Sequence, residues 1–151
     1  MPNPRHRTRS VVQARERVLV DSGVWIALVR ATDGHHTDAD RLLRQAARDR
    51  AQLLTTNLIV AEVHRFLLFH IGIQPAAIFL DRLQASPLLV TEFVTAAQHT
   101  AARSWLAKLS DQVITYTDAV SFAVMESARC TAVMSFDHDF VTAGFRLWQL
   151  R

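Results

Sequence analysis

The chain has 151 residues, of which 50% are apolar and 21% charged, with four glycines and four prolines. This composition suits one domain with a substantial core and excludes a disordered or fibrous chain. The longest apolar run, Val24–Val29, is far shorter than the about 20 residues that a membrane span requires. The one cysteine, Cys130, has no partner for an internal disulfide, which indicates a reducing, cytoplasmic location.

Positive charge is concentrated at the N-terminus. The formal net charge is +3 and the isoelectric point about 10.0, values that invite a nucleic-acid interpretation. Residues 1–17 hold five arginines and one glutamate, whereas residues 18–151 hold 12 basic and 13 acidic residues. We therefore expect residues 1–17 to be a basic, flexible N-terminal extension and residues 18–151 to form a single domain.

Short apolar runs typical of strands alternate with helical patterns along that domain. The predicted strands are residues 18–20, 53–54, 88–91, 113–114, 132–136 and 146–150; the predicted helices are residues 23–30, 38–50, 58–71, 75–85, 95–109 and 118–129, with a short helix from 137. Ser22 and Thr117 are placed to cap the helices that follow them. This alternation predicts parallel pairing and a three-layer α/β/α sandwich with a central, mostly parallel sheet.

Acidic residues follow the predicted strands. Asp21 directly follows the first strand, Asp137 and Asp139 follow the fifth, and Asp118 opens the helix after the fourth. Ligands of an open parallel sheet bind outside the carboxyl ends of its strands, so we expect these side chains to converge there. Glu62 is a fifth candidate, because a carboxylate within an apolar helical run needs a partner.

Converging carboxylates repel one another and need a cation, for which Mg²⁺ is the natural candidate and Mn²⁺ the alternative. Each acid also has a structural interpretation. Asp21 and Asp118 could be helix-capping acids, Glu62 could pair with Arg65 one turn later, and Asp137 could simply open a turn.

Four segments resemble the motifs of PIN-domain ribonucleases, and most closely those of VapC-type toxins from bacterial toxin–antitoxin pairs. The segments are residues 18–28 (VLVDSGVWIAL), 55–66 (TTNLIVAEVHRF), 115–125 (TYTDAVSFAVM) and 135–140 (SFDHDF). They occur in the expected order and extend over nearly all of residues 18–151. The resemblance implies a PIN-like fold and metal-dependent RNA hydrolysis that leaves 5′-phosphate and 3′-hydroxyl ends.

The resemblance also implies the site residues. The catalytic and metal-binding acids would be Asp21, Glu62, Asp118 and Asp137, with Asp139 sharing the role of the last. Thr117 and Ser22 are accessory candidates, and Arg65 is a candidate RNA contact because it follows Glu62 by one helical turn.

The implied partners are an RNA substrate, either transfer RNA or ribosomal RNA, and a VapB-like antitoxin that offers an apolar and basic segment. A homodimer is also expected, with the apolar helices at residues 58–71 and 78–83 as its candidate surface. No membrane association is expected.

Two other functions remain at this point. A phosphatase of the haloacid-dehalogenase type shares the strand-then-aspartate opening, but it needs a second aspartate where this chain has Gly23. A catalytically inactive PIN-like module would bind RNA or protein without cleaving it. Cleavage of total RNA that requires Mg²⁺ and is abolished by EDTA separates an enzyme from such a module.

Overall fold

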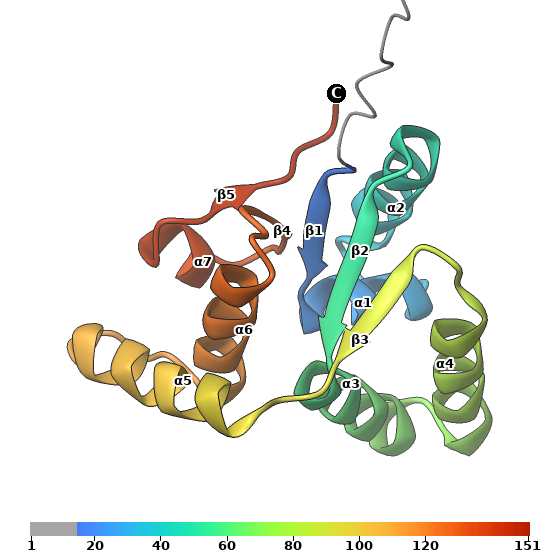
Figure 1. Ribbon diagram of the computed structural model, residues 1–151. Helices are drawn as coiled ribbons and strands as arrows, with labels where there is room; N and C mark the ends of the chain where they lie inside the picture. The colour runs from blue at the N-terminus through green and yellow to red at the C-terminus, as the bar shows by residue number, and fades with distance from the viewer. Residues whose placement is uncertain (1–14) are drawn as a thin grey trace, which may run out of the picture.

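Five short strands form one sheet in a computed structural model that describes residues 15–151. The strands are β1 (Arg17–Val20), β2 (Gln52–Thr56), β3 (Leu89–Glu92), β4 (Ala132–Met134) and β5 (Arg146–Leu147). They are arranged in the order β3-β2-β1-β4-β5, and every neighbouring pair is parallel (Figure 1). Most of the predicted extension, residues 1–14, lies outside the described part, and β1 itself begins at Arg17.

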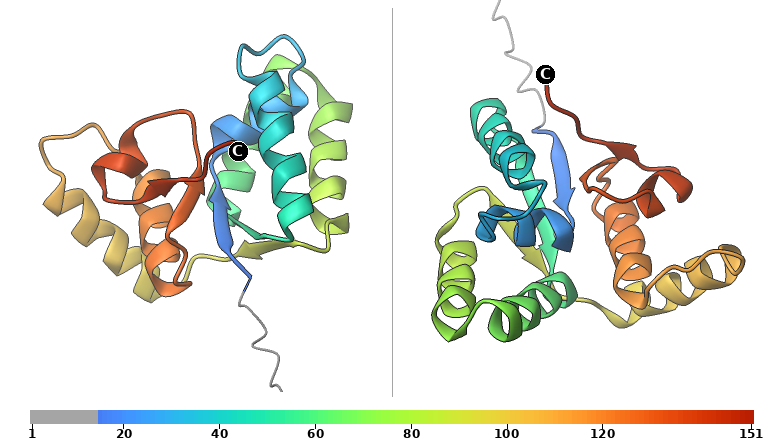
Figure 2. Two further views of the ribbon diagram at one scale, coloured as in Figure 1. Left: turned by 90° about the horizontal axis from the view of Figure 1, so that it is seen from above. Right: turned by 180° about the vertical axis from the view of Figure 1, so that it is seen from behind.

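Helices cover both faces of the sheet. They are α1 (Ser22–Val29), α2 (His36–Asp49), α3 (Asn57–His70), α4 (Ile73–Ala85), α5 (Ala96–Lys108), α6 (Tyr116–Ser127) and α7 (Asp139–Thr142). Figure 2 shows α1–α4 on one side of the sheet and α5–α7 on the other, which confirms the three-layer α/β/α sandwich. Across residues 15–151, every helix is too short or too polar to cross a membrane.

The chain reverses its direction of travel at β1. It proceeds from β1 outward through β2 to β3, and then returns to the other side of β1 to add β4 and β5. The helices that follow β1 and β4 consequently leave toward opposite faces, so the carboxyl ends of these two strands form the switch point of the sheet, where ligands of such folds bind. Val20 and Met134 pair at that end, so the residues after them, Asp21 and Ser135, lie side by side.

The core is built on β1, whose residues Val18, Leu19 and Val20 are all fully buried. Burial on both faces explains why this strand is a continuous apolar run rather than an alternating one. On the α5–α7 side, the fully buried ring of Phe122 lies 5.1 Å from the ring of Phe140, in an edge-to-face arrangement.

The two ends of the described chain are joined by Glu16. Its carboxylate accepts a hydrogen bond from Trp148 Nε1 at 3.1 Å and forms an ion pair with Arg146. Residues 16 and 148 therefore lie together at the amino-terminal edge of the sheet, where Figure 1 shows the C-terminus beside the start of β1.

Three local predictions differ from the structure. Residues 113–114 do not form a strand; they lie in the connection between α5 and α6, and Val113 is 97% exposed. Asp21, rather than Ser22, is the N-cap of α1. The N-cap of α6 is Thr115 and not Thr117, because Thr115 has the extended backbone of a cap and its hydroxyl accepts from the Asp118 N–H at 3.1 Å.

Candidate active site

Asp21 is the innermost acid of the site. It follows β1, is only 4% exposed, and has a donor on each carboxylate oxygen. The Ser22 backbone N–H donates to Oδ1 at 2.8 Å, and the Ser135 hydroxyl donates to Oδ2 at 2.9 Å. Burial raises the pKa of Asp21 to about 6, and the charges of Asp137 and Glu62 act in the same direction, while the two hydrogen bonds lower it.

Asp118 lies near Asp21, in the first turn of α6, where it is partly buried. Burial is the largest cause that raises its pKa, to about 7, followed by the negative charge of Asp21 and then those of Asp137 and Asp139. The Thr115 hydroxyl acts in the opposite direction. Asp118 is therefore close enough to three other acids for their charges to oppose its ionisation.

Asp137 lies in the bend that follows β4, and Asp139 is the first residue of α7. The Asp137 carboxylate accepts from the Asp139 N–H at 3.1 Å, and the Asp137 N–H donates to the Ser135 hydroxyl at 3.3 Å. Burial and the charge of Asp137 raise the pKa of Asp139, and a hydrogen bond with the Asp118 side chain lowers it. Both aspartates thus belong to the cluster, one exposed and the other partly buried.

Glu62 approaches the cluster from the second turn of α3. The residue lies on the exposed side of that helix, yet partial burial raises the pKa of its carboxyl, and its charge is among those that raise the pKa of Asp21. The five predicted acids are therefore brought to one edge of the sheet, beyond β1 and β4. We call Asp21, Glu62, Asp118, Asp137 and Asp139 the acidic cluster.

No cation balances the acidic cluster within residues 15–151. The ion pairs in that part of the chain are Arg44–Asp40, Arg146–Glu16 and Arg151–Asp49, all away from the cluster. The predicted pairing of Glu62 with Arg65 does not form; the Arg65 guanidinium instead lies over the Phe69 ring, 5.1 Å from its centre. The structural interpretation of Glu62 as a helix ion pair is therefore wrong.

The chemistry of the cluster fits a hard divalent cation. Its donors are all carboxylate oxygens, the ligands that Mg²⁺ and Mn²⁺ prefer. The raised pKa values of Asp21 and Asp118 reflect charged forms that a bound cation would stabilise. As the side chains are placed, no group of three or more histidine, cysteine or acidic residues among residues 15–151 is arranged to hold a metal ion.

Removing one carboxylate should stabilise the metal-free protein at high pH. Because the pKa of Asp118 is raised in the folded protein, the folded protein holds a proton that the unfolded chain releases. The stabilisation that comes from this protonated carboxyl is therefore lost as the pH rises through about 7. In EDTA, we expect Asp118→Asn to melt near the wild-type temperature at pH 5 and a few °C above it at pH 8. A shift of that size corresponds to a gain of about 1 kcal/mol in the free energy of unfolding. A pH-independent difference would contradict this, and Asp111→Asn, in the exposed turn after α5, is the matched control.

Ser135 is a site residue that sequence reasoning missed. Its hydroxyl donates to Asp21 and accepts from the Asp137 N–H, so one side chain links the ends of β1 and β4. Its position directly after a buried strand and two residues before Asp137 is the signal that could have identified it. Ser22 does contact Asp21, but through its backbone N–H, and the capping role expected of Thr117 belongs to Thr115.

Loss of the Ser135 hydroxyl should weaken the site without removing an acid. We expect Ser135→Ala to lower kcat/KM for RNA cleavage about 10–100-fold, because the hydroxyl orients Asp21, which the sequence motifs predict to be a metal ligand, and loss of such support usually has an effect of this size. Ser135→Thr, which keeps the hydroxyl, should retain most of the activity, and Ser110→Ala, in the turn after α5, should retain all of it. Equal activity of Ser135→Ala and Ser110→Ala would show that Asp21 needs no such support.

A parallel sheet with an acidic cluster at its switch point is compatible with several classes of enzyme, including nucleases, and comparison with known proteins identifies the family. The profile described as "PIN domain" matches residues 18–146, and the chain belongs to that family. It is a nuclease of the VapC-type ribonuclease class, as the four motifs predict. The alternative of a haloacid-dehalogenase-type phosphatase is therefore wrong.

Among curated relatives, the "23S rRNA-specific endonuclease VapC20" of Mycobacterium tuberculosis is 32% identical over 128 residues, which are 85% of this chain and 95% of the relative. "Ribonuclease VapC13" of the same species is 32% identical over 126 residues, covering 82% of this chain and 92% of the relative.

Solved structures agree with this assignment. The crystal structure of M. tuberculosis VapC20, described as a "Sarcin-Ricin loop cleaving toxin", superposes with a TM-score of 0.74 at 28% identity, and the match covers 85% of this chain and 95% of that one. FitAcB from Neisseria gonorrhoeae superposes with a TM-score of 0.59 at 16% identity, over 87% of this chain and 96% of that one, and shares the fold.

Proposed function

We propose that this ribonuclease is the toxin of a toxin–antitoxin pair and that it cleaves ribosomal RNA internally with the help of Mg²⁺, or of Mn²⁺ as the alternative. The observation that carries the proposal is the acidic cluster, which gathers five carboxylates at the switch point with no counter-cation in the described chain. Such a cluster is poorly suited to binding a phosphate by itself, and well suited to binding one through a divalent cation.

The position of each residue of the acidic cluster suggests its role in cleavage. A divalent cation, when bound, would neutralise the scissile phosphate and lower the pKa of a water molecule. Asp21 and Asp118, the two most buried carboxylates of the acidic cluster, would be its principal ligands, and Asp137 would complete the set with Asp139 beside it. Glu62, on the exposed side, would orient the attacking water. Ser135 and the Ser22 N–H hold the Asp21 carboxylate in one orientation.

Ribosomal RNA is favoured over transfer RNA because VapC20, which is similar over 85% of this chain, is named for its action on 23S rRNA. The test is to incubate the purified protein with ribosomal RNA and with transfer RNA, in Mg²⁺, Mn²⁺ or EDTA, and to map the 5′ ends. We expect discrete cuts in the large ribosomal RNA that carry 5′-phosphates and disappear in EDTA. Cuts in transfer RNA alone would overturn the substrate, and binding without any cleavage would leave only a non-catalytic module.

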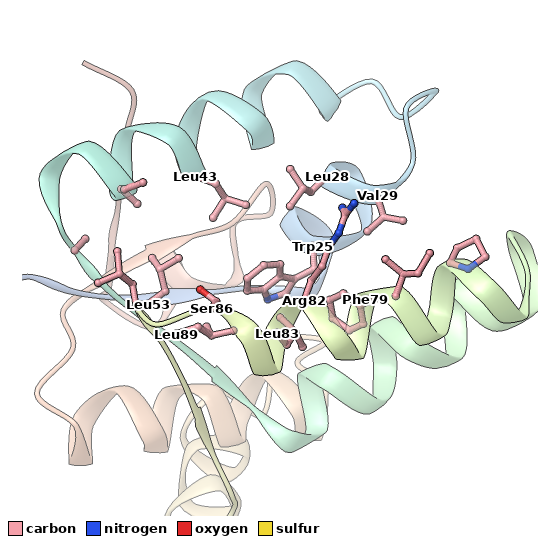
Figure 3. Close-up of a pocket in the computed structure, with 16 residues that line it drawn as sticks. Trp25, Leu28, Val29, Leu43, Leu53, Phe79, Arg82, Leu83, Ser86 and Leu89 are labelled. Atoms are coloured by element: carbon pink, nitrogen blue, oxygen red, sulfur yellow. The ribbon is translucent and has the colours of Figure 1, made fainter.

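An apolar groove supports the proposal of an antitoxin partner. The groove has a volume of about 440 Å³ and is lined by apolar side chains that include Trp25, Leu43 and Phe79, with Arg82 at its margin. Figure 3 shows side chains of α1 and α2 facing those of α4 across it. We place the apolar part of a VapB-like antitoxin here, with its basic part reaching the acidic cluster. Retention of full antitoxin affinity by Leu43→Glu would contradict this position.

A homodimer is proposed on the exposed surface where α3 meets α4. Phe69 is 69% exposed and Ile73 is 76% exposed, and Ile71, in the short connection between the two helices, is exposed as well. A surface of this kind is unusual for a monomer in water. Sedimentation should give twice the mass of one chain for the wild type, and the mass of one chain for the double variant Phe69→Ser/Ile73→Ser.

The buried free thiol of Cys130 supports a cytoplasmic location, which fractionation of the native host would test.

A further inference from the structure

Two groups of charged residues of the described chain gather at opposite edges of the sheet, although Glu16 also lies at the basic edge. The acidic cluster lies beyond the carboxyl ends of the strands. At the amino ends, Arg15 and Arg17 lead into or open β1, Arg50 precedes β2, Arg129 precedes β4, and Arg146 opens β5. Because all five strands are parallel, these arginines share one edge, on the side of the sheet opposite the acids.

The arginines continue from that edge onto the outer face of α2. The C-terminal segment is held against α2 by Gln45, whose Nε2 donates to the Gln149 carbonyl at 3.1 Å and whose Oε1 accepts from the Arg151 N–H at 2.9 Å. Arg151 is thereby placed beside the arginines of α2. Figure 1 shows the start of β1, the end of α2 and the C-terminus at the same end of the molecule.

Three shallow hollows connect these arginines into one surface. The first, about 430 Å³, is lined by Arg15, Glu16, Arg17 and Arg129, and the second, about 520 Å³, shares Glu16 with it. The third, about 300 Å³, shares Arg151 with the second and lies over α2. We call the arginines that line the three hollows the arginine belt: Arg15, Arg17, Arg41, Arg44, Arg48, Arg129, Arg146 and Arg151.

Most of the belt has no acidic partner. Arg44, Arg146 and Arg151 pair with Asp40, Glu16 and Asp49, whereas the other five arginines form no ion pair within residues 15–151. The 14 residues that precede Arg15 contain three more arginines and no acid, so they cannot supply the missing partners. Five unpaired guanidinium groups on one surface favour an anionic partner with several charges.

We propose that the arginine belt is a second RNA-binding surface, which holds phosphates of a structured RNA away from the strand that is cut. This inference rests on the proposed function, because the partner is the enzyme's own substrate. The acidic cluster repels a phosphate backbone until a cation is bound, so the attraction that brings RNA to the protein must come from elsewhere on its surface. Arginine forms bidentate hydrogen bonds with phosphate, and the belt spreads eight of them over one edge and one helix face.

The size of the protein determines which RNAs can contact the arginine belt while they are bound at the acidic cluster. A domain of this length is about 40 Å across, so only an RNA that extends around the molecule reaches both the belt and the cluster. A short oligonucleotide that is bound at the acidic cluster does not extend to the arginine belt. The belt therefore contributes to affinity for a long, structured RNA and leaves the cleavage of a short one unchanged.

The test compares two triple variants that remove equal charge. Arg15→Gln/Arg48→Gln/Arg129→Gln removes three exposed, unpaired arginines of the belt, and Arg30→Gln/Arg103→Gln/Lys108→Gln removes three exposed cations elsewhere. Both are made with Asp21→Asn, so that RNA binds without being cut. Dissociation constants are measured over a range of salt concentrations, for a fragment of large ribosomal RNA and for a short oligonucleotide that carries the mapped cleavage site.

We expect the belt variant to bind the long RNA at least about tenfold more weakly at moderate salt, and its slope of log K against log salt to fall by about two to three. The control triple should bind both RNAs as the parent does, and the belt variant should bind the short RNA normally. With Asp21 restored, the belt variant should cleave the short RNA at the wild-type rate.

Unchanged binding of the long RNA by the belt variant would overturn the proposed role of the arginine belt. An equal loss of affinity in the control triple variant, or an equal loss of affinity for the short RNA, would overturn it as well. A loss of binding to vesicles that contain anionic lipid, with RNA binding intact, would assign the arginines to a membrane surface and also overturn it. Failure of the proposed function is distinguishable, since the unsubstituted protein would then cleave neither RNA in Mg²⁺ whatever the belt binds.

Discussion

Asp21→Asn is expected to reduce RNA cleavage by at least about a thousandfold while the protein stays folded. The substitution removes a charge that we assign to cation binding, and the loss of several kcal/mol of transition-state stabilisation corresponds to a factor of that order. The amide still offers an oxygen to the Ser22 N–H, and its nitrogen can donate to Ser135 after that hydroxyl rotates. Initial rates on ribosomal RNA at saturating Mg²⁺ measure the effect.

The melting temperature of Asp21→Asn in EDTA separates a catalytic from a structural cause. Burial raises the pKa of Asp21 to about 6, so above that pH the ionised carboxylate destabilises the metal-free folded protein. The neutral variant should therefore melt at or above the wild-type temperature at pH 8. A variant that is inactive because it unfolds, or one that keeps more than about a tenth of the activity, would remove Asp21 from the role proposed for it.

Phe122→Ala is expected to cause the largest loss of stability among single substitutions outside the site. The ring is fully buried and lies 5.3 Å from the Trp105 ring, 5.1 Å from the Phe140 ring and 5.7 Å from the Phe145 ring. Removing it leaves a cavity that three elements border, which typically costs about 3–5 kcal/mol. For a chain of this size that corresponds to a fall in Tm of roughly 10–15 °C.

Phe93→Ala is the matched control, because it removes the same side chain from a position that is 71% exposed. Its free energy of unfolding should stay within about 0.5 kcal/mol of the wild type. Urea denaturation of both variants checks the pair. Since Phe122 follows Asp118 by one turn on α6, Phe122→Ala should also reduce cleavage, and equal stabilities of the two variants would contradict the packing described here.

The order of elements and the convergence of the acids could be predicted from the sequence because both depend on local pattern. Apolar runs followed by Asp21 and Asp137 indicate strand ends, and parallel pairing then brings these ends to one edge. The predicted strand at residues 113–114 was wrong because an apolar pair carries no sign of its burial. The helices before and after it pack directly on each other, which leaves Val113 in solvent while Ile114 packs partly against the core.

Finer features depended on contacts between segments far apart in the chain. Thr115 and Thr117 are both suitable caps, and only the extended backbone at Thr115 decides between them. The role of Ser135 follows from the pairing of β1 with β4, which no pattern within either segment reveals. The sequence also showed that residues 18–151 are nearly neutral in sum, but the separation of the two signs onto opposite edges required the fold.

The closure of the chain ends by Glu16 bears on how the enzyme should be handled in the laboratory. Because Glu16 holds Trp148 and Arg146, both ends of the described chain leave the molecule on the side opposite the acids. An affinity tag or a solid support attached after Arg151 should leave the acidic cluster accessible to small substrates. The same attachment would lie beside Arg151 of the arginine belt, so we expect a C-terminally tagged protein to cleave a short RNA at the normal rate and to bind a long, structured RNA more weakly than the untagged protein.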